Sequence, residues 1–465
     1  MENNRKSFYL LGVLAIAVLY VAVRLWRLTD SCLWFDEIFG VHAALYPWSE
    51  MFWFLAQDLI HPPLFYVFLK IWILAGGESL LWLRLFSVFW ETLAIFPLVL
   101  LCRELKFSSR ETFTALIFLA VNGLLVKYAQ EVRMYGMLFC IAIFSIWLFA
   151  RFLNRNEKTT FLWLFFVNLL LIYTHYFGWL VVGSELLAIF IWKRERIWQF
   201  LLGILLLALS FAPWAWAVAS AARMNSGLAQ NIGWQSKPTL RALLTLVFSL
   251  HEPFYYQQSN LDAPNLIYIA LPFALVCLAA IVFAFINKDN FSARLLLVLA
   301  LTPLIVAFAG SWLFPYSIWG IRHLIVIFAP YALLAALGLN RLRPQMLKIS
   351  AYVLLCTLVV LGCVLHFRRP APVYIWCGWE DLSKKALAQD AEKAPVIYAF
   401  EDLVAYHLWF ATKNSDRRVQ IVSIKDYPEM IEDKAYFLPR GFSEIRVGDQ
   451  TALEGKRFWL AFRET

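Results

Sequence analysis

The sequence predicts an all-α polytopic membrane protein of about 11–13 transmembrane helices with a small C-terminal α/β domain. Of its 465 residues, 62% are hydrophobic and 16% are charged, whereas soluble domains are roughly 45 to 50% apolar and about 25% charged. Apolar segments long enough to cross roughly 30 Å of hydrocarbon recur through residues 1–367. Charged residues become frequent after that point. We therefore expect a transmembrane domain over residues 1–367 and a soluble domain over residues 368–465.

About eleven segments are predicted to cross the membrane. The first follows Arg5 and Lys6 as a signal peptide would, but no small-residue cleavage site comes after it, so we interpret it as an uncleaved helix. Residues 61–76 begin with a Pro pair and end at two glycines, which fits a crossing, a re-entrant helix or an interfacial helix. The expected spans are 8–28, 79–101, 110–127, 133–150, 160–176, 178–192, 197–219, 264–287, 293–313, 321–340 and 347–367.

The basic loops assign the orientation of these spans. Counting residues 61–101 as one net crossing places "CRELKFSSR", "RFLNRNEK", "KRER", "NKDNFSAR" and "RLRPQMLK" on the side of the N-terminus, which the positive-inside rule makes the cytoplasm. The C-terminal domain and the loops near 29–60 and 221–260 then lie outside, and in a bacterium the protein would sit in the inner membrane. Cytoplasmic Lys and Arg also account for the net charge of +9, so no nucleic-acid partner is expected.

Two adjacent carboxylates, Asp36 and Glu37, follow the first span in "CLWFDEIFG". A carboxylate just outside the hydrocarbon can be partly desolvated and still reach water, which suits a general base. The alternative is a pair that caps the next short helix, where the helix dipole favours negative charge. Nothing in the flanking "LWF" requires a cap, so the sequence favours a catalytic pair.

Further polar residues on the outer face suit an anionic ligand. His61, before the Pro pair, either starts a helix or binds an anion such as a lipid phosphate. Arg133 in "QEVRMY" offers a planar fork of donors for phosphate. The alternatives are an ion pair with Glu131 or an arginine that snorkels to the interface. Tyr135, in the same stretch, can stack on a ring-shaped substrate.

A second cationic position, Arg322 and His323, lies at the outer end of an apolar span. The positive-inside rule predicts few basic residues there, which favours a functional pair over a topological charge. His175 lies in a polar break between two spans, where an interfacial histidine fits as well as a catalytic one. Arg84 and Glu91 share one apolar helix and are interpreted as members of buried structural pairs, although intramembrane charges are also functional candidates.

The cysteines and carboxylates form no diagnostic metal pattern. The seven cysteines are scattered without a CxxC pair, so neither a zinc site nor a disulfide framework is indicated, although Cys32 and Cys377 both lie on the outer side and can pair. A divalent metal at the carboxylates is compatible with the sequence, and no other cofactor is expected, since it contains neither a nucleotide-phosphate loop nor an HExxH helix.

The C-terminal domain has its own pattern. "APVIYAF" and "RVQIVSI" predict short buried strands, and "EDLSKKALAQDAEKA" predicts an amphipathic helix. These elements together indicate a small α/β domain, which we expect to be accessory.

The order and spacing of several motifs resemble a known family. They are the DE pair after the first helix, "HPPLFY", "GGESLLWLRLFS", "QEVRMYGM" and "IRHLIVIFAPYALLAALGL". Over residues 1 to about 367 the chain resembles the GT-C superfamily of membrane glycosyltransferases. Within it, the chain is most similar to the protein O-mannosyltransferase and aminoarabinose transferase-like group, which includes bacterial members of unassigned substrate. The resemblance implies inverting transfer of a sugar from a polyprenyl-phosphate donor on the extracytoplasmic side.

The resemblance also implies roles for the candidate residues. Asp36 becomes the catalytic acid/base residue and Glu37 its neighbour at the acceptor, which would be a lipid, glycan or protein of the cell envelope. By the same resemblance, the donor phosphate is expected to bind near His61, at the position where aminoarabinose transferases have Lys. Arg133 and Arg322 are further candidates for binding it.

Two other classes of function remain open, a lipid-linked-sugar flippase or other transporter, and a scaffold that uses the C-terminal domain. The outer-face clustering of polar residues and the lack of an internal repeat favour an enzyme over a transporter.

Overall fold

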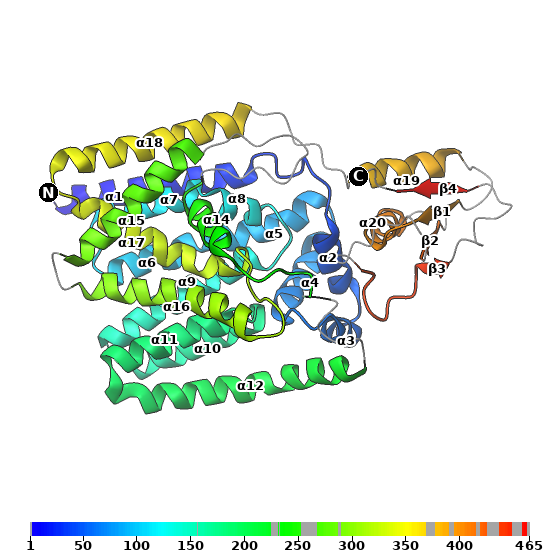
Figure 1. The fold of residues 1–465 in the computed structure, drawn as a ribbon, viewed down its shortest axis with the longest axis horizontal. Helices are drawn as coiled ribbons and strands as arrows, with labels where there is room; N and C mark the ends of the chain where they lie inside the picture. The colour runs from blue at the N-terminus through cyan, green and yellow to red at the C-terminus, as the bar shows by residue number, and fades with distance from the viewer. Residues whose placement is uncertain are drawn as a thin grey trace.

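The computed structural model places a bundle of long helices beside a small C-terminal domain (Figure 1). It describes residues 2–155, 157–224, 231, 233–252, 267–286, 290–368, 377–389, 395–414, 419–425, 437–448 and 458–462. The rest of the loop expected over 221–260, residues 225–230, 232 and 253–260, lies outside the described residues. The predicted fold class, a helical membrane domain followed by a small α/β domain, is confirmed.

The helical domain begins with a mixture of long and short helices. They are α1 (Glu2–Leu25), α2 (Phe35–Leu45), α3 (Trp48–Asp58), α4 (Leu64–Gly76), α5 (Leu80–Leu93), α6 (Ile95–Glu104), α7 (Ser109–Val121), α8 (Gly123–Ala129), α9 (Tyr135–Arg155), α10 (Lys158–Thr174), α11 (Gly178–Trp192), the 3-10 turn η1 (Arg194–Arg196) and α12 (Ile197–Met224). It continues with α14 (Leu240–His251), α15 (Ile267–Ile286), α16 (Phe291–Leu313), the 3-10 helix η2 (His323–Ile327), α17 (Phe328–Arg341) and α18 (Gln345–Arg368).

Each expected span coincides with helical structure. Within the described residues, 7 helices are long and apolar enough to cross a membrane, and α5 with α6 counts as one of them. α4 has 13 residues, so it extends only about 20 Å and is too short to cross roughly 30 Å of hydrocarbon. In Figure 1, α2, α3 and α4 lie at the end of the bundle that faces the C-terminal domain. These short helices thus form one end of the bundle.

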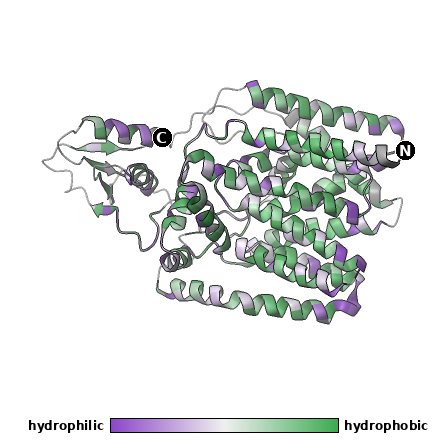
Figure 2. Ribbon diagram, turned by 180° about the vertical axis from the view of Figure 1, so that it is seen from behind, coloured by the Kyte–Doolittle hydropathy of each residue, from purple (hydrophilic) through white to green (hydrophobic). Residues whose placement is uncertain are grey.

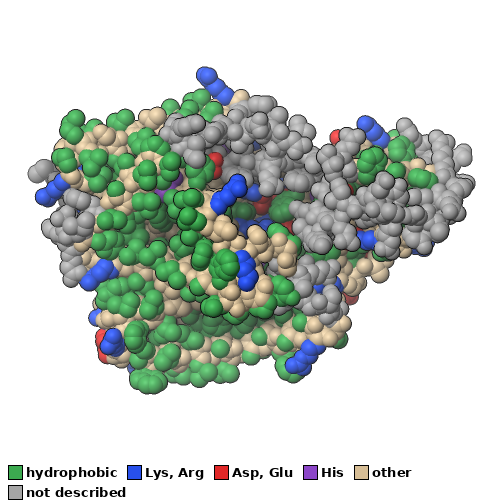
Figure 3. Space-filling view, in the orientation of Figure 1, with side chains coloured by type: hydrophobic (Ala, Val, Ile, Leu, Met, Phe, Trp, Pro, Cys, Tyr) green, Lys and Arg blue, Asp and Glu red, His purple; other side chains and the backbone are tan. Residues whose placement is uncertain are grey.

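Burial separates the central helices from those that face lipid. The span containing η2 and α17 is 89% buried in the protein, whereas the span formed by α1 is 17% buried although it is more apolar. A helix that is apolar on its exposed side requires an apolar solvent. The helices consist largely of hydrophobic residues along their length in Figure 2, and hydrophobic side chains are spread over the face of the helical bundle that Figure 3 shows. The protein is therefore an integral membrane protein.

The two buried charges of α5 pair with other elements. Arg84 Nη2 lies 3.4 Å from Glu37 Oε2, and Glu91 Oε2 lies 3.5 Å from Arg24 Nη2. Arg24 also donates to the backbone carbonyls of Leu119 and Ala120 at the end of α7. These contacts fit the structural interpretation of Arg84 and Glu91, since each charge has a partner in the protein interior.

The C-terminal domain contains a parallel sheet. Its strands are β1 (Val396–Ala399), β2 (Gln420–Ile424), β3 (Arg446–Gly448) and β4 (Trp459–Ala461), in the order β3-β2-β1-β4. The predicted strands are β1 and β2, and the predicted helix is α19 (Gly378–Gln389). A further helix, α20 (Asp402–Thr412), connects β1 to β2 and packs on both.

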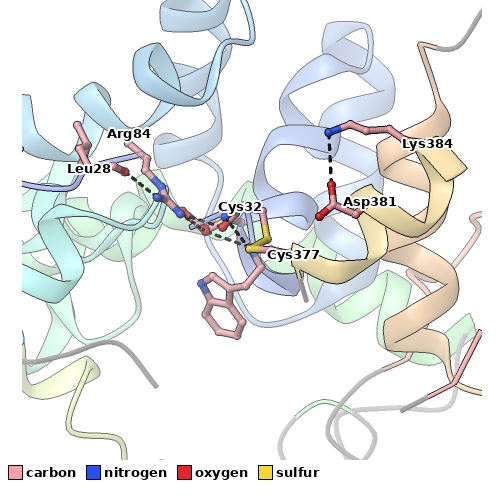
Figure 4. The surroundings of a disulfide bond; sticks show 8 residues. Leu28, Cys32, Arg84, Cys377, Asp381 and Lys384 are labelled. Atoms are coloured by element: carbon pink, nitrogen blue, oxygen red, sulfur yellow. Dashed lines mark hydrogen bonds and ion pairs between the residues drawn. A yellow bond between two sulfur atoms is a disulfide. The ribbon is translucent and has the colours of Figure 1, made fainter. Parts of the chain in front are cut away.

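Three kinds of contact join this domain to the helical bundle. Cys32 forms a disulfide with Cys377, and Arg84 donates a 2.9 Å hydrogen bond to the Cys32 carbonyl beside it (Figure 4). Lys413 forms a 2.8 Å ion pair with Glu78. An aromatic cluster joins α2 and α3 to the C-terminal domain through the rings of His42, Tyr46, Phe54, Tyr406, Trp409 and Phe442.

Candidate active site

Asp36 lies between two arginines at the start of α2. Its Oδ2 atom is 3.5 Å from Arg133 Nη2 and 3.6 Å from Arg322 Nη1. Arg133 also donates a 3.0 Å hydrogen bond to the backbone carbonyl of Asp36. The Arg133 side chain is only 3% exposed, compared with 24% for Asp36 and 27% for Arg322. The structure thus brings three predicted site residues together, with Asp36 and Arg322 as the accessible members.

These three residues line a cavity of about 660 Å³. Histidines and a second aspartate contribute to its polar lining, whereas α11 and α12 contribute an apolar wall. The wall residues from α12 are Phe211, Ala215, Val218, Ala219 and Ala222. A cavity that combines a few charged groups with a long apolar wall suits an amphipathic ligand.

His61 lies between α3 and α4, where it contacts both Asp58 and Arg133. Its Nδ1 atom is 3.0 Å from Asp58 Oδ2, and its Nε2 atom is 3.4 Å from Arg133 Nη2. Burial, together with the Arg133 charge, lowers the pKa of His61, so the imidazole is neutral at pH 7. Because an ionised carboxylate only accepts, Nδ1 carries the proton and Nε2 accepts from Arg133. Asp58 and His61 therefore orient the guanidinium group that contacts Asp36.

His175 and His323 also line the cavity. The His175 ring centroid lies 6.1 Å from that of His61 and 5.0 Å from that of His323. Nδ1 of His175 accepts a 3.1 Å hydrogen bond from the Phe177 backbone N–H. Burial and the neighbouring His61 place the pKa of His175 well below its usual value, so this ring is neutral and its proton is on Nε2. His175 can therefore donate one hydrogen bond to a ligand.

Glu37 has a different environment from Asp36. It is fully buried and is absent from the residues that line the cavity. Its carboxylate accepts from the backbone N–H groups of Trp34 at 3.1 Å and Val132 at 2.7 Å, and from Arg84 Nη2 at 3.4 Å. The contact with Trp34 is that of an N3 residue capping its own helix. Glu37 therefore caps α2, which is the alternative to a catalytic role, and it also forms a buried ion pair with Arg84.

Glu131 and Tyr135 lie near the site without lining the cavity. Glu131 Oε1 is 3.9 Å from Lys127 Nζ, and burial raises the pKa of Glu131 to about 7. Its backbone carbonyl accepts a 2.5 Å hydrogen bond from Ser87. The guanidinium carbon of Arg133 is 5.9 Å from the centre of the Tyr135 ring. Both residues support the segment that carries Arg133.

The adjacent carboxylates do not share a set of metal ligands. Among the residues that the structure describes, no group of three or more His, Cys, Asp and Glu side chains is placed to hold a metal ion. Asp36 faces two guanidinium groups, and Glu37 already accepts from three donors. A divalent cation prefers several converging oxygen ligands, and these two side chains do not converge.

Several residues that the sequence did not predict complete the cavity. Asp58 is the last residue of α3 and precedes His61 by three positions in "DLIHPP", and the turn at Leu59 that ends the helix leaves their side chains 3.0 Å apart. Asn231, Phe437, Pro439 and Arg440 also line the cavity. No local pattern marks these four, because they reach the site only through tertiary folding.

The fold and the cavity together define an architecture. A helical membrane bundle with short helices and charged residues at one end is joined there to a small α/β domain. No family model and no curated protein matches the sequence.

Two solved structures share this architecture. The structure of ArnT from Cupriavidus metallidurans bound to undecaprenyl phosphate gives a TM-score of 0.59 at 13% identity, over 90% of this chain and 86% of ArnT. The apo structure of the same protein gives 0.56 at 12% identity, over 91% and 87%. Since sequence identity is this low, the likeness shows a common fold. It confirms the resemblance in fold that the motifs predicted.

Proposed function

We propose that the protein transfers a sugar from a polyprenyl-phosphate-linked donor to a cell-envelope acceptor, on the outer side of a bacterial inner membrane. The observation that carries this proposal is that one cavity joins Asp36, flanked by Arg133 and Arg322, to the apolar wall of α12. A polyprenyl-phosphate sugar has the matching parts, an anionic head and an apolar tail. The same fold in ArnT was solved with undecaprenyl phosphate bound, which supports this class of lipid.

The two arginines are the proposed phosphate ligands. Their distances to Asp36 Oδ2, 3.5 and 3.6 Å, exceed those of good charge-assisted hydrogen bonds, which are roughly 2.7 to 2.9 Å. A phosphate can therefore compete for the same guanidinium groups with shorter contacts. His175 can add a neutral donor through Nε2. His61 is hydrogen-bonded to Asp58 on one side of its ring and contacts Arg133 on the other, so it holds the Arg133 guanidinium group in place.

The transfer step requires one bond to form and one to break at the anomeric carbon of the sugar. The acceptor oxygen bonds to that carbon while the bond from the carbon to the phosphate oxygen breaks, and the electron pair stays on the phosphate. Arg133 and Arg322 stabilise the charge that builds there, and Asp36 takes the proton of an acceptor hydroxyl. Each effect is typically worth about 10² to 10⁴ in rate. An ionised phosphate acceptor would carry no such proton, and Asp36 would then orient it.

The test compares lipids that co-purify with the wild-type protein, with Asp36→Asn and with Asp381→Asn. Asp381 is 75% exposed on α19, pairs with Lys384 and does not line the cavity, so it is a matched carboxylate control. Mass spectrometry after gentle detergent extraction is expected to find a polyprenyl-phosphate sugar enriched on Asp36→Asn. Transfer of that sugar to envelope acceptors should be lost in Asp36→Asn and retained in Asp381→Asn.

Two outcomes would contradict the proposal. Normal turnover by Asp36→Asn would remove the assigned role of this residue. Translocation of a lipid-linked sugar in proteoliposomes without any sugar transfer would identify a transporter instead.

A further inference from the structure

A tight turn of the C-terminal domain reaches the cavity. The Phe442 backbone N–H donates a 3.1 Å hydrogen bond to the Pro439 carbonyl, which closes a four-residue turn with Arg440 and Gly441 at its tip. Gly441 has φ +76°, and a Cβ added there would lie 3.0 Å from Gln57 Oε1. A positive φ at the third position of a turn favours glycine. Gly441 therefore allows Arg440 to approach the end of α3.

Arg440 caps the end of α3 from a distant part of the chain. Its Nη1 atom donates a 2.7 Å hydrogen bond to the Gln57 backbone carbonyl, one residue before α3 ends at Asp58. The last carbonyls of a helix have no partner within the helix, and a cation there also interacts favourably with the helix dipole. Arg440 thus satisfies an acceptor that α3 itself cannot satisfy.

The second terminal nitrogen of Arg440 is connected to Asp58 through Asn231. Nη2 of Arg440 donates a 2.5 Å hydrogen bond to Asn231 Oδ1. Asn231 Nδ2 in turn lies 2.5 Å from the Asp58 backbone carbonyl and 3.4 Å from Asp58 Oδ1. The second carboxylate oxygen of Asp58 accepts from His61, which contacts Arg133. A continuous set of contacts therefore runs from the C-terminal domain to the arginine beside Asp36.

We propose that the C-terminal domain contributes to the geometry of this site, and that Arg440 is a positioning residue that fixes the Asp58–His61 pair. Arg440 acts directly on the end of α3 and indirectly through Asn231. The meaning of this role for catalysis rests on the proposed function. The disulfide at Cys32, four residues before Asp36, ties the same domain to the start of α2. The domain therefore supports the site at two points.

Hydrogen exchange in the full-length protein tests the positioning without any ligand. Arg440→Gln is expected to speed amide exchange in residues 57–61 by about tenfold, because the end of α3 loses its cap. Arg446→Gln is the matched control, since Arg446 is exposed on β3 of the same domain. It should leave that segment unchanged. Arg440→Lys retains the charge without the two-pronged geometry and should give an intermediate effect, which also tests the proposal if Arg440→Gln fails to fold.

Binding of undecaprenyl phosphate tests the link to the site. Arg440→Gln and Asp58→Asn are each expected to weaken binding about tenfold, and the double variant should be no weaker than either single variant, because both changes break the same set of contacts. Effects that multiply to about a hundredfold would show that Arg440 acts independently of Asp58, and would overturn the proposal.

The two tests separate the two proposals. Unchanged exchange at residues 57–61 in both Arg440 variants would overturn the positioning role, whatever the binding result. If the wild-type protein binds no undecaprenyl phosphate while Arg440→Gln still loosens residues 57–61, the proposed donor is wrong and the positioning role stands.

Discussion

Asp36 and Glu37 are neighbours in the chain, but their carboxylates have different surroundings. A helix turns about 100° per residue, so adjacent side chains at its start point in different directions. Asp36 lines the cavity, whereas Glu37 points into the protein and accepts from three donors. The acidic pair therefore combines one accessible group with one structural group.

Replacing Glu37 should affect stability. In Glu37→Gln the charge that faces Arg84 is lost, and an amide nitrogen replaces one of the accepting oxygens. We expect a loss of about 1 to 3 kcal/mol in the free energy of unfolding, measured by thermal unfolding in detergent. Asp36→Asn, at a position that is partly exposed, should unfold close to the wild-type temperature. An unchanged unfolding temperature for Glu37→Gln, combined with loss of transfer, would instead identify Glu37 as a ligand of the acceptor.

Arg133 should be sensitive even to a change that retains its charge. It uses different nitrogens to contact the Asp36 carbonyl and His61 Nε2, and the point charge of a lysine cannot reproduce that fork. We expect Arg133→Lys to weaken binding of undecaprenyl phosphate by about tenfold, as measured by isothermal titration. Arg151→Lys is a suitable control, because Arg151 pairs with Glu157 outside the cavity. Equal affinities for the two variants would argue against a phosphate role for Arg133.

Three neighbouring helices share a polar ring inside the membrane domain. Ser145 Oγ of α9 lies 2.5 Å from Asn168 Oδ1 of α10 and 2.6 Å from Glu185 Oε1 of α11. Asn168 Nδ2 donates to Glu185 Oε2 at 2.8 Å. A hydroxyl has one proton and an amide oxygen has none, so the ring lacks a donor unless the Glu185 carboxyl retains its proton. With that proton each contact has one donor, and the ring closes without a buried charge.

Glu185 variants test this proton count. Glu185→Gln supplies an N–H in place of the carboxyl O–H, so its unfolding temperature should match that of the wild-type protein. Glu185→Leu leaves Ser145 and Asn168 with unmet hydrogen bonds and should lose about 1 to 3 kcal/mol of stability. The measurement is thermal unfolding of both variants in the same detergent. A large loss in Glu185→Gln would show that the ring needs an ionised carboxylate.

Much of the architecture could be predicted because membranes impose simple rules on sequence. Apolar length located the helices, and the motifs indicated the fold that ArnT shares. The predicted topology placed the candidate polar residues on one face of the membrane. Six of them line one cavity, namely Asp36, His61, Arg133, His175, Arg322 and His323. The number of crossings and the orientation of the termini stay predictions.

The remaining features depend on contacts between distant parts of the chain. Arg440 is 383 positions from the carbonyl it caps, and Cys32 is 345 positions from its disulfide partner. Sequence periodicity reports only neighbours within one element, so neither contact leaves a local signal. The predicted topology allowed Cys32 and Cys377 to pair, but nothing in the pattern required it. Glu37 could not be separated from Asp36 by pattern alone, because the partners that bury it, Arg84 and Val132, come from other segments.

The association of the two domains should weaken in acid, because His42 lies in the aromatic cluster between them. His42 Nδ1 is 2.7 Å from the Tyr406 hydroxyl, and burial lowers the pKa of His42 to about 3. In the unfolded chain its pKa is about 6.5. Between these values the unfolded state binds a proton that the folded state does not, so the full stability is present above pH 6.5 and is lost as the pH falls toward 3. At pH 4.5 the loss from this group is about 3 kcal/mol.

His42→Gln separates this contribution from those of other buried histidines. Glutamine can still accept a hydrogen bond from Tyr406 but does not titrate. We expect the difference in unfolding temperature between pH 7.5 and pH 4.5, followed by tryptophan fluorescence, to be smaller in His42→Gln than in the wild-type protein. His407, whose pKa burial also lowers to about 3, contributes to both proteins equally. Parallel pH curves would show that His42 becomes protonated without loosening the contact, and that the disulfide and the Lys413–Glu78 pair hold the domains together in acid.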